Sequence, residues 1–284
     1  MMVIEVQGGL GNQMFQYALG YKLALMGKEI RYDISSFNEK RENLRKLDLS
    51  IFHLEFPVAT EKELIRYGHG NSFIGKISRK IGIGIERIYI DDIDRGYQQE
   101  IFSMDDVYLS GYWQSEKYFK DIRSELLKLY RMPVGINEDS KDLISEIEET
   151  VSVSLHIRRG DYLTEQNKKI YGGICTFQYY EHALELVRQK LGNIRVYIFT
   201  DAPEWAKKVF REKDYIVVEK DAGRNDAVDL FLMSKCKANI IANSSFSWWA
   251  AWLNQNEEKI VVSPKKWFNN HDTLDMICED WLTA

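Results

Sequence analysis

The chain has 284 residues, of which 45% are hydrophobic and 29% are charged, with 38 Lys and Arg against 43 Asp and Glu. This composition is that of a folded globular protein and excludes a disordered, fibrous or membrane-embedded chain. The formal net charge of −5 excludes a global positive field for nucleic acid or an anionic membrane, so any anion must be bound locally. At about 150 residues per domain, the length predicts two domains.

The cysteines and the first residues of the chain indicate the cellular compartment. Cys175, Cys236 and Cys278 are odd in number and widely spaced, which fits neither paired disulfides nor a zinc site and favours a reducing compartment. No basic segment followed by an apolar run opens the chain, and no run of about 18 apolar residues occurs. We therefore expect neither a secretion signal nor a transmembrane anchor.

The chain begins with a pattern typical of a βαβ unit. Residues 2–6 predict a strand, Gly8-Gly9 predicts a turn, and apolar residues at helical spacing from Asn12 onward predict a helix that Gly27 ends. Residues 29–32 predict a second strand.

The pattern then weakens. From about 34 to 110 we expect irregular, partly helical structure, and residues 116–130 predict a helix with one apolar face. Pro133-Val134-Gly135 interrupts this helix and predicts a boundary between an N-terminal domain, 1–135, and a C-terminal domain, 136–284.

The second half alternates between strands and helices. Strands are predicted at 151–157, 195–199, 215–218, 238–242 and 259–262, and helices at 139–149, 177–191, 203–210, 227–236 and 245–253. This alternation predicts an α/β fold with a parallel sheet covered on both faces. The last segment, 272–281, predicts a terminal helix that packs back across the two halves.

Ligands of open parallel sheets bind beyond the carboxyl ends of the strands, so the residues at those ends carry the functional information. The first such junction contains Gly9, Gly11, Asn12 and Gln13. Its glycines let the backbone approach a ligand, and its polar side chains donate from a helix start. A dinucleotide site is an alternative, with Asp33 as the ribose-binding acid, but Met14 occupies the third glycine position of that motif. A merely tight turn is the other alternative.

The second junction, His156-Ile157-Arg158-Arg159-Gly160-Asp161, directly follows an apolar strand. Two adjacent arginines there require an anionic partner, and the planar guanidinium suits phosphate oxygens. We interpret this segment as a diphosphate site, with a surface salt bridge to Asp161 as the alternative. His156 either binds the phosphate or is an ordinary buried histidine, and from its own position the second reading is favoured.

Two further junctions follow later strands. Asp201 either caps the next helix or accepts a hydrogen bond from a base or ribose hydroxyl. The last junction contains Asn243, Ser244, Ser245 and Phe246 and opens a helix whose N-terminal amides and hydroxyls can bind an anion.

Metal binding is not favoured. Asp92-Ile93-Asp94 is an Asp-x-Asp pair, but this pattern is frequent in acidic chains, and we interpret it as a solvated loop. The histidines are too scattered for zinc. We predict no metal site.

Together these residues carry a resemblance. The segments GGLGNQMFQYALG (8–20), HIRRGDY (156–162), FTDAPEW (199–205) and IIANSSFSWWAAWL (240–253) resemble the ordered motif set of glycosyltransferase family 11, the α-1,2-fucosyltransferases of bacterial type. GYWQSEKYF (111–119) and SPKKWF (263–268) are also similar to family segments.

The resemblance implies a GT-B-like fold, with two Rossmann-like domains facing across a cleft. It implies inverting transfer of fucose from GDP-β-L-fucose, bound by the C-terminal domain, to the 2-hydroxyl of a terminal galactose-type residue held on the N-terminal, acceptor side. No metal or other cofactor is implied. The acceptor is a galactose-terminated oligosaccharide or a lipid-linked glycan. The setting it implies is the cytoplasm, with peripheral contact to the inner face of a bacterial membrane left open.

The resemblance also implies residue roles. Arg158 holds the diphosphate, supported by Arg159 and Asp161, while His156 is drawn toward the donor and Asp201 toward the guanosine. Asn243 to Phe246 face the phosphates and nucleoside, and Gly9 to Gln13 approach the fucose and acceptor. The motif names no general base. Asp161, Glu165 on a mobile loop, and Asp33 are the candidates, beside a substrate-assisted path. A related transferase with another nucleotide sugar or linkage, and an inactive glycan- or nucleotide-binding module, remain the alternative functions.

Overall fold

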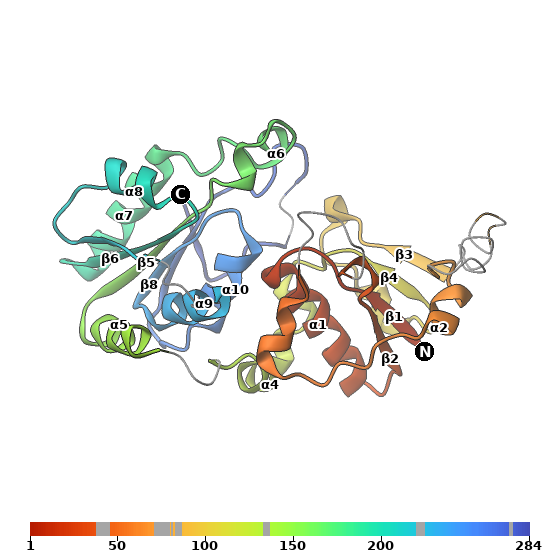
Figure 1. The fold of residues 1–284 in the computed structure, drawn as a ribbon. Helices are drawn as coiled ribbons and strands as arrows, with labels where there is room; N and C mark the ends of the chain where they lie inside the picture. Colours follow the sequence, from red (N-terminus) through yellow and green to blue (C-terminus); the bar gives the residue numbers. More distant parts are fainter. Residues whose placement is uncertain are drawn as a thin grey trace. The chain divides into compact units, whose positions relative to one another are not determined.

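The computed structural model describes residues 1–37, 46–70, 80, 82, 87–132, 137–219, 225–272 and 275–284. The chain divides into two compact units, Met1–Tyr130 and Arg131–Ala284 (Figure 1). The predicted boundary between residues 135 and 136 lies outside the described residues.

The first unit is built on a four-stranded parallel sheet in the order β2-β1-β4-β3. Its strands are β1 (Met2–Glu5), β2 (Ile30–Asp33), β3 (Ile88–Ile90) and β4 (Tyr108–Ser110), and its α-helices are α1 (Leu10–Leu25), α2 (Glu61–Arg66) and α4 (Arg123–Leu129). Helix α1 packs closely on the sheet at Gly20, where an added Cβ would lie 2.4 Å from the Tyr32 hydroxyl and 2.8 Å from Ile4. The predicted opening βαβ unit is confirmed.

Two predictions for this unit need correction. The stretch expected to be irregular contains strands β3 and β4, each of only three residues, which is too short to show a period of two. The expected helix over 116–130 is α-helical only from Arg123, and two 3-10 turns, Glu116–Tyr118 and Lys120–Ile122, precede it. Phe119 interrupts the helix because its φ of −150° is outside the helical region.

The second unit is built on a six-stranded parallel sheet in the order β10-β9-β8-β5-β6-β7. Its strands are β5 (Ser152–Ile157), β6 (Arg195–Thr200), β7 (Tyr215–Val217), β8 (Ala238–Ile240), β9 (Ile260–Ser263) and β10 (Leu282–Thr283). Counted along this unit from the β7 edge, the order is 3-2-1-4-5-6, that of the doubly wound nucleotide-binding fold. In such sheets the ligand lies where the strand order reverses, here between β5 and β8.

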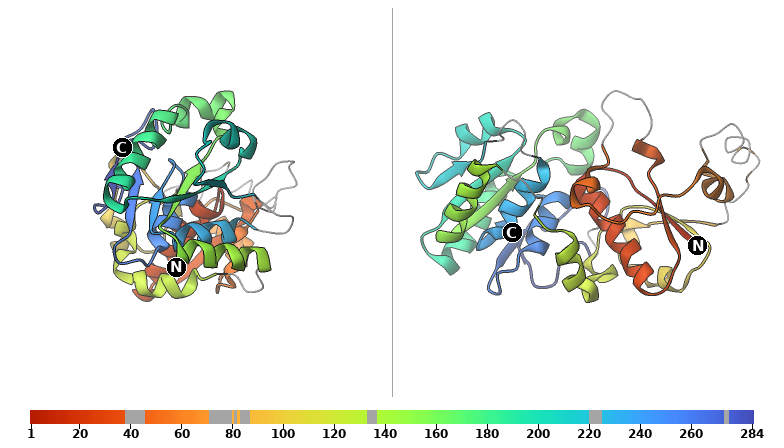
Figure 2. Two further views of the ribbon diagram at one scale, coloured as in Figure 1. Left: turned by 90° about the vertical axis from the view of Figure 1, so that its left-hand side faces the viewer. Right: turned by 60° about the horizontal axis from the view of Figure 1, so that its bottom comes forward.

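Helices cover both faces of this sheet (Figures 1 and 2). They are α5 (Glu138–Glu149), α6 (Glu165–Tyr171), α7 (Phe177–Leu191), α8 (Pro203–Val209), α9 (Asp226–Lys235) and α10 (Ser245–Leu253). Val153, Leu155 and Ile157 of β5 are buried in one hydrophobic cluster with residues of α7 and α8. The alternate residues face the other way, and there the buried Asn239 amide donates 2.7 Å to the Ser154 hydroxyl, joining β8 to β5.

The predicted terminal helix over 272–281 is wrong. Among the described residues of that segment, Asp275 has a φ of 59°, and the Trp281 amide closes a turn on the Cys278 carbonyl. The left-handed backbone at Asp275 ends any helix there. The chain then forms β10, which pairs with β9 in its own unit.

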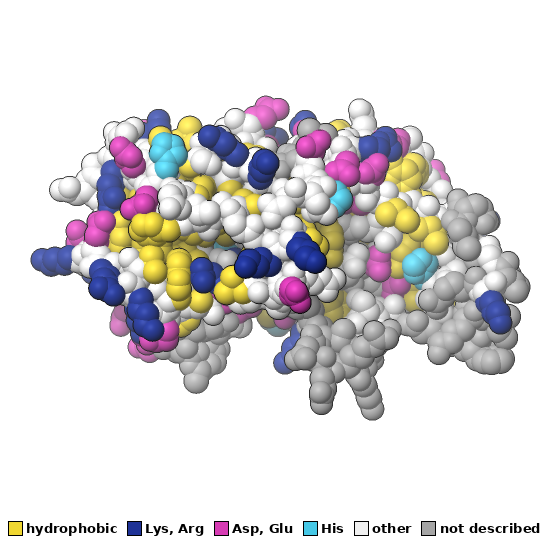
Figure 3. Space-filling model, turned by 90° about the horizontal axis from the view of Figure 1, so that it is seen from above, with side chains coloured by type: hydrophobic (Ala, Val, Ile, Leu, Met, Phe, Trp, Pro, Cys, Tyr) yellow, Lys and Arg dark blue, Asp and Glu magenta, His cyan; other side chains and the backbone are white. Residues whose placement is uncertain are grey.

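Both units therefore combine a wholly parallel sheet with covering helices, which confirms the α/β class and the two Rossmann-like domains of a GT-B-like fold. Over the parts of the chain that the structure describes, no helix has the length and hydropathy needed to cross a membrane. Basic side chains on the face shown in Figure 3 are interspersed with acidic ones rather than gathered in one field, in keeping with the nearly balanced charge.

Candidate active site

The loop after β5 is organised around Arg158. Its Nε and Nη2 atoms each lie 2.9 Å from Asp161 Oδ1, and its Nη1 atom lies 3.1 Å from Asp201 Oδ2. The anionic partners that sequence reasoning required are thus, in this structure, the protein's own carboxylates. The Nε contact is a hydrogen bond and the other two are ion pairs, so the guanidinium keeps N–H groups for a further anion.

Arg158 is fully charged in this setting. Burial opposes its charge, but the hydrogen bond to Asp161 and the charges of Asp201 and Asp161 hold the pKa of Arg158 above its ordinary value. The side chain keeps 26% of its surface exposed, so a ligand can reach it.

Asp201 organises the same loop from the end of β6. Its Oδ1 accepts from the Arg159 amide at 2.9 Å and its Oδ2 from the Gly160 amide at 3.1 Å. A Cβ at Gly160 would lie 2.8 Å from Oδ2, so glycine allows this close approach. The helix-capping alternative for Asp201 is wrong, because Ala202 is the N-cap of α8 and has no side-chain cap. The role of Asp201 as an acceptor from a base or ribose hydroxyl stays a prediction. Both carboxylate oxygens are already bonded within the protein.

Arg159 points to a different neighbour. Its guanidinium carbon lies 4.1 Å from the centre of the Trp205 ring, a cation–π distance. The two adjacent arginines are therefore separated in role: Arg158 is held by carboxylates, and Arg159 lies on an aromatic face.

The junction after β8 supplies a helix N-terminus. Ser244 is the N-cap of α10, and its hydroxyl makes no capping bond. The first amides of a helix have no partner within the helix and carry a positive partial charge. Because β8 pairs directly with β5, this N-terminus and the Arg158 loop follow neighbouring strands at the switch point of the sheet. Of the predicted donor residues, Ser245 and Phe246 lie in its first turn, partly buried.

Asn243, predicted to face the ligand, is instead turned into the protein. Its Nδ2 donates to the carbonyls of Trp267 at 3.0 Å and Tyr171 at 3.3 Å, and its Oδ1 accepts from Cys175 Sγ at 3.4 Å. Its backbone carbonyl accepts from the Tyr162 hydroxyl at 2.8 Å, which joins the two junctions. The side chain is 2% exposed, so it fixes the loops around the site.

His156 is a buried histidine beneath this region. Burial, and then the charge of Arg158, lower the pKa of His156 to about 3, so the ring is neutral. Its centre lies 5.7 Å from that of Phe246. Its Nδ1 has no hydrogen-bond partner among the described residues.

Glu165 is not on a loop as expected. It is the first residue of α6, whose N-cap is Thr164, and its side chain is exposed. The capping pattern Thr164 to Asn167 is visible in the sequence and was the missed signal for this helix.

In the first unit, Gln13 has no atom left for a ligand. The side chain is fully buried; its Nε2 donates to the carbonyls of Gly8 and Lys46, at 2.9 and 2.8 Å, and its Oε1 accepts from the amides of Asp48 and Leu49. The prediction that it donates to a ligand from the helix start is therefore corrected: Gln13 fastens the glycine turn to the segment at 46–49.

The turn itself lies as predicted, directly after β1. Gly8 has a φ of 81°, which favours glycine, and Gly9 is the N-cap of α1, with no side-chain cap. Gly11 is buried in the first turn of α1. Asn12 is partly exposed, and its Oδ1 accepts from Gln114 Nε2 at 2.7 Å. Gln114 follows β4, the strand beside β1, and the sequence did not single it out.

The carboxylates at the ends of these strands differ in accessibility. Asp33, predicted as a base, is 4% exposed and accepts from the Ser35 amide and the Tyr108 hydroxyl. Glu5, the last residue of β1, is partly buried, and burial raises the pKa of Glu5 above its ordinary value. Sequence reasoning missed Glu5 because it treated the residue as an interior position of the strand.

The Asp-x-Asp pair, Asp92 and Asp94, lies at a short 3-10 turn, Ile93–Arg95. Asp92 caps a 3-10 turn, with its Oδ1 accepting from the Asp94 amide at 3.3 Å, and both side chains are exposed. Within the described ranges, no group of three or more potential metal-ligating side chains is found.

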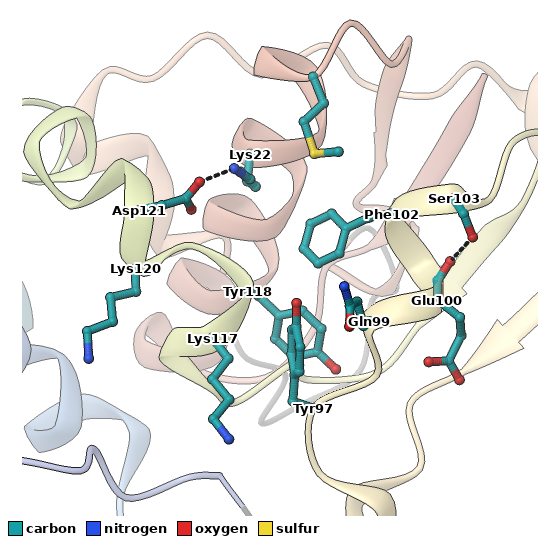
Figure 4. A pocket seen from close by; sticks show the side chains of 11 residues that line it. Lys22, Tyr97, Gln99, Glu100, Phe102, Ser103, Lys117, Tyr118, Lys120 and Asp121 are labelled. Atoms are coloured by element: carbon teal, nitrogen blue, oxygen red, sulfur yellow. Dashed lines mark hydrogen bonds and ion pairs between the residues drawn. The ribbon is translucent and has the colours of Figure 1, made fainter.

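A pocket of about 1010 Å³ in the first unit is separate from these junctions. The rings of Tyr97, Phe102 and Tyr118 lie together in it (Figure 4). Its wall includes Lys22, ten residues beyond Asn12 on α1 and paired with Asp121. At 1.5 Å per residue, this wall lies about 15 Å along the helix from the glycine turn.

The chain is similar to known proteins over most of its length. Residues 89–282 match the profile described as Glycosyl transferase family 11. The chain is 33% identical to the O-antigen biosynthesis glycosyltransferase WbnK of Escherichia coli, over 98% of both chains. It is 32% identical to an alpha-1,2-colitosyltransferase of Escherichia coli, over 99% of this chain and 98% of that one. It is also 24% identical to the galactoside 2-alpha-L-fucosyltransferase Sec1 of Mus musculus, over 89% of this chain and 64% of that one. The predicted resemblance is confirmed: the chain belongs to glycosyl transferase family 11.

Proposed function

We propose that this protein transfers L-fucose from GDP-β-L-fucose, with inversion, to the 2-hydroxyl of a terminal galactose-type residue of a glycan. The observation that carries the proposal is that Arg158 and the N-terminus of α10 follow neighbouring strands, β5 and β8, at the switch point of the second sheet. A guanidinium and a helix N-terminus both stabilise phosphate oxygens.

The proposed roles follow from the contacts. Arg158 offers its remaining N–H groups to the diphosphate, while Asp161 and Asp201 fix the orientation of the guanidinium. The amides and hydroxyls at Ser244 and Ser245 take further phosphate oxygens. As the sugar–phosphate bond breaks, negative charge grows on the leaving diphosphate, and these fixed positive groups stabilise it in the transition state.

We further propose that the reaction needs no divalent metal. Arg158 and the helix dipole supply the charge stabilisation that a metal ion supplies in other nucleotide-sugar transferases. Release of GDP in the presence of EDTA tests this point. A strict requirement for added Mg²⁺ or Mn²⁺ would refute it.

The first experiment measures GDP release from GDP-fucose in EDTA, with and without lactose or another terminal β-galactoside, followed by linkage analysis of the product. We expect acceptor-dependent release and an α-1,2-linked fucoside. A product with another linkage would refute the proposed acceptor position.

A second experiment tests Arg158. The Arg158→Ala variant should lose at least 100-fold in kcat, because a cation aimed at the leaving group is removed. Arg159→Ala is the matched control, since that guanidinium lies on Trp205 and pairs with no carboxylate found in the described residues. Equal losses in the two variants would contradict the separate role of Arg158.

Colitose, the 3-deoxy analogue of fucose, is the second candidate for the transferred sugar. It is favoured by the 32% identity to an alpha-1,2-colitosyltransferase over nearly the whole of both chains. A buried hydrogen bond to the 3-hydroxyl would discriminate strongly against the deoxy sugar, whereas an apolar contact would not. Competition between GDP-fucose and GDP-colitose for one acceptor identifies the donor.

GDP-sugar binding without transfer to any acceptor would indicate a binding module instead.

We propose that the enzyme works in the cytoplasm and contacts the inner face of the membrane peripherally when its acceptor is lipid-linked. Three free cysteines among the described residues suit a reducing compartment. Fractionation of cells producing the protein tests this location, and recovery in the periplasm would refute it.

A further inference from the structure

The first sheet also has a switch point. The residues at the carboxyl ends of its neighbouring strands β2, β1 and β4 are Asp33, Glu5 and Ser110. The order β2-β1-β4-β3 places β1 between β2 and β4, with Glu5 paired to Asp33. The register with β4 continues from Ile4 and Leu109, so Ser110 lies beside Glu5 on the other side. Glu5 therefore sits at the centre of the carboxyl edge, three residues before Gly8 of the Gly8-Gly9 turn.

The carboxylates of Asp33 and Glu5 differ in how many of their oxygens accept hydrogen bonds. Both oxygens of Asp33 accept hydrogen bonds, from the Ser35 amide and the Tyr108 hydroxyl, and the side chain is buried. Glu5 uses one oxygen only: its Oε2 accepts from the Ser110 hydroxyl at 2.5 Å and from Gln7 Nε2 at 3.4 Å. Its Oε1 accepts no hydrogen bond from any residue in the described part of the chain. One oxygen is anchored and the other is available to a ligand.

We propose that Glu5 is the general base of the transfer, a role that rests on the proposed function. In the step, the acceptor hydroxyl oxygen forms a bond to the anomeric carbon of the donor sugar, and the hydroxyl proton passes to Glu5. The bond from that carbon to the diphosphate breaks, and GDP leaves with the electron pair. The protonated Glu5 later returns its proton to water.

The surroundings of Glu5 suit this role. Burial and the neighbouring charge of Asp33 raise the pKa of Glu5, which makes the carboxylate a stronger base than an exposed glutamate, and the Ser110 bond lowers it partly back. The groups that face it electrostatically are Asp33, Tyr108 and Tyr112. The other base candidates are less well placed: Asp161 is bonded to Arg158, and Glu165 begins an exposed helix.

The test compares Glu5→Gln with wild type in acceptor-dependent transfer and in GDP-fucose binding. We expect kcat to fall at least 100-fold while the Kd for GDP-fucose stays within about two-fold, because general-base catalysis contributes roughly this factor and the donor contacts are untouched. Glu5→Asp keeps a carboxylate and should retain part of the activity together with the acid limb of the pH profile. Transfer by Glu5→Gln within ten-fold of wild type would overturn the proposal.

Ser110→Ala separates a proton-accepting role from a structural one. It removes the anchor but leaves the carboxylate, so activity should persist, with the acid limb of kcat/KM moved to higher pH. If Glu5 served only to hold Ser110, both variants would lose activity equally, which would overturn the proposal. Wild-type protein without transfer to any galactoside would instead count against the proposed function, so the two failures are distinguishable.

Discussion

Replacing Asp201 by alanine should destabilise the second unit through the loop that carries Arg158. The change removes two hydrogen bonds, from the amides of Arg159 and Gly160 at 2.9 and 3.1 Å, and an ion pair with Arg158 Nη1 at 3.1 Å. Bonds to a charged acceptor contribute about 1.5–3 kcal/mol each when buried, and about 1 kcal/mol each is the better value where water can replace part of them. The carboxylate of Asp201 keeps 24% exposure, so we expect a loss of about 3 kcal/mol in the free energy of unfolding.

Asp161→Ala is the matched control. Its carboxylate is 36% exposed and bonds Arg158 through one oxygen, so its removal should cost about 1 kcal/mol or less, as for exposed ion pairs. Urea unfolding followed by tryptophan fluorescence measures both, because Trp205 lies against Arg159 in this unit. The transitions of the two units should be fitted separately. A loss below about 0.5 kcal/mol for Asp201→Ala, or equal losses in the two variants, would refute the reasoning.

Three more predictions follow from contacts in the two units. Burial lowers the pKa of His156 to about 3 in the folded protein, whereas the unfolded chain binds a proton at this residue near pH 6.5. The free energy of unfolding therefore decreases as the pH falls from about 6.5 toward 3. Between pH 7 and pH 5 wild type should lose about 2 kcal/mol relative to His156→Gln in urea melts, and a constant difference would contradict the assignment. Gln13→Ala removes four hydrogen bonds to the main chain and should cost about 3 kcal/mol, against under about 1 kcal/mol for Asn12→Ala, measured in the same melts. Gly160→Ala places a Cβ 2.8 Å from Asp201 Oδ2, and calorimetric titration should show GDP binding weakened about ten-fold; unchanged binding would dissociate this loop from the donor.

Sequence reasoning succeeded where a local signal was long and regular. Helices α7 and α10 begin and end at the predicted residues, because each has a clear N-terminal signal and a sustained helical pattern. Strands β3 and β4 were missed because three residues carry no measurable period, and their pairing with β1 and with each other depends on distant segments. Helices and strands could thus be predicted mainly where apolar residues recur at a regular spacing.

The position of each candidate junction in the fold was predictable, but the contacts of its side chains were not. The junctions follow β1, β5, β6 and β8 as expected, yet Asn243 and Gln13 are buried in contacts within the protein, and Asp201 binds amides about 40 residues earlier in the chain. Residue type and spacing cannot show which way a polar side chain turns, because that depends on which distant backbone groups lack partners. The contact of Glu5 with Ser110 was not predictable for the same reason, since the two residues are 105 positions apart.

The switch point of the second sheet has a consequence for how the protein is made. Residues of β5 and β8 that touch, such as Ser154 and Asn239, are separated by 85 positions, so their loops meet only after a long stretch of chain has been synthesised. Until α10 is synthesised, the Arg158 loop lacks the helix N-terminus with which it would share the diphosphate in the proposed function. The proposed function therefore predicts that donor nucleotide binds only the nearly finished chain, and that GDP-sugar present during refolding stabilises the last folding step rather than the first.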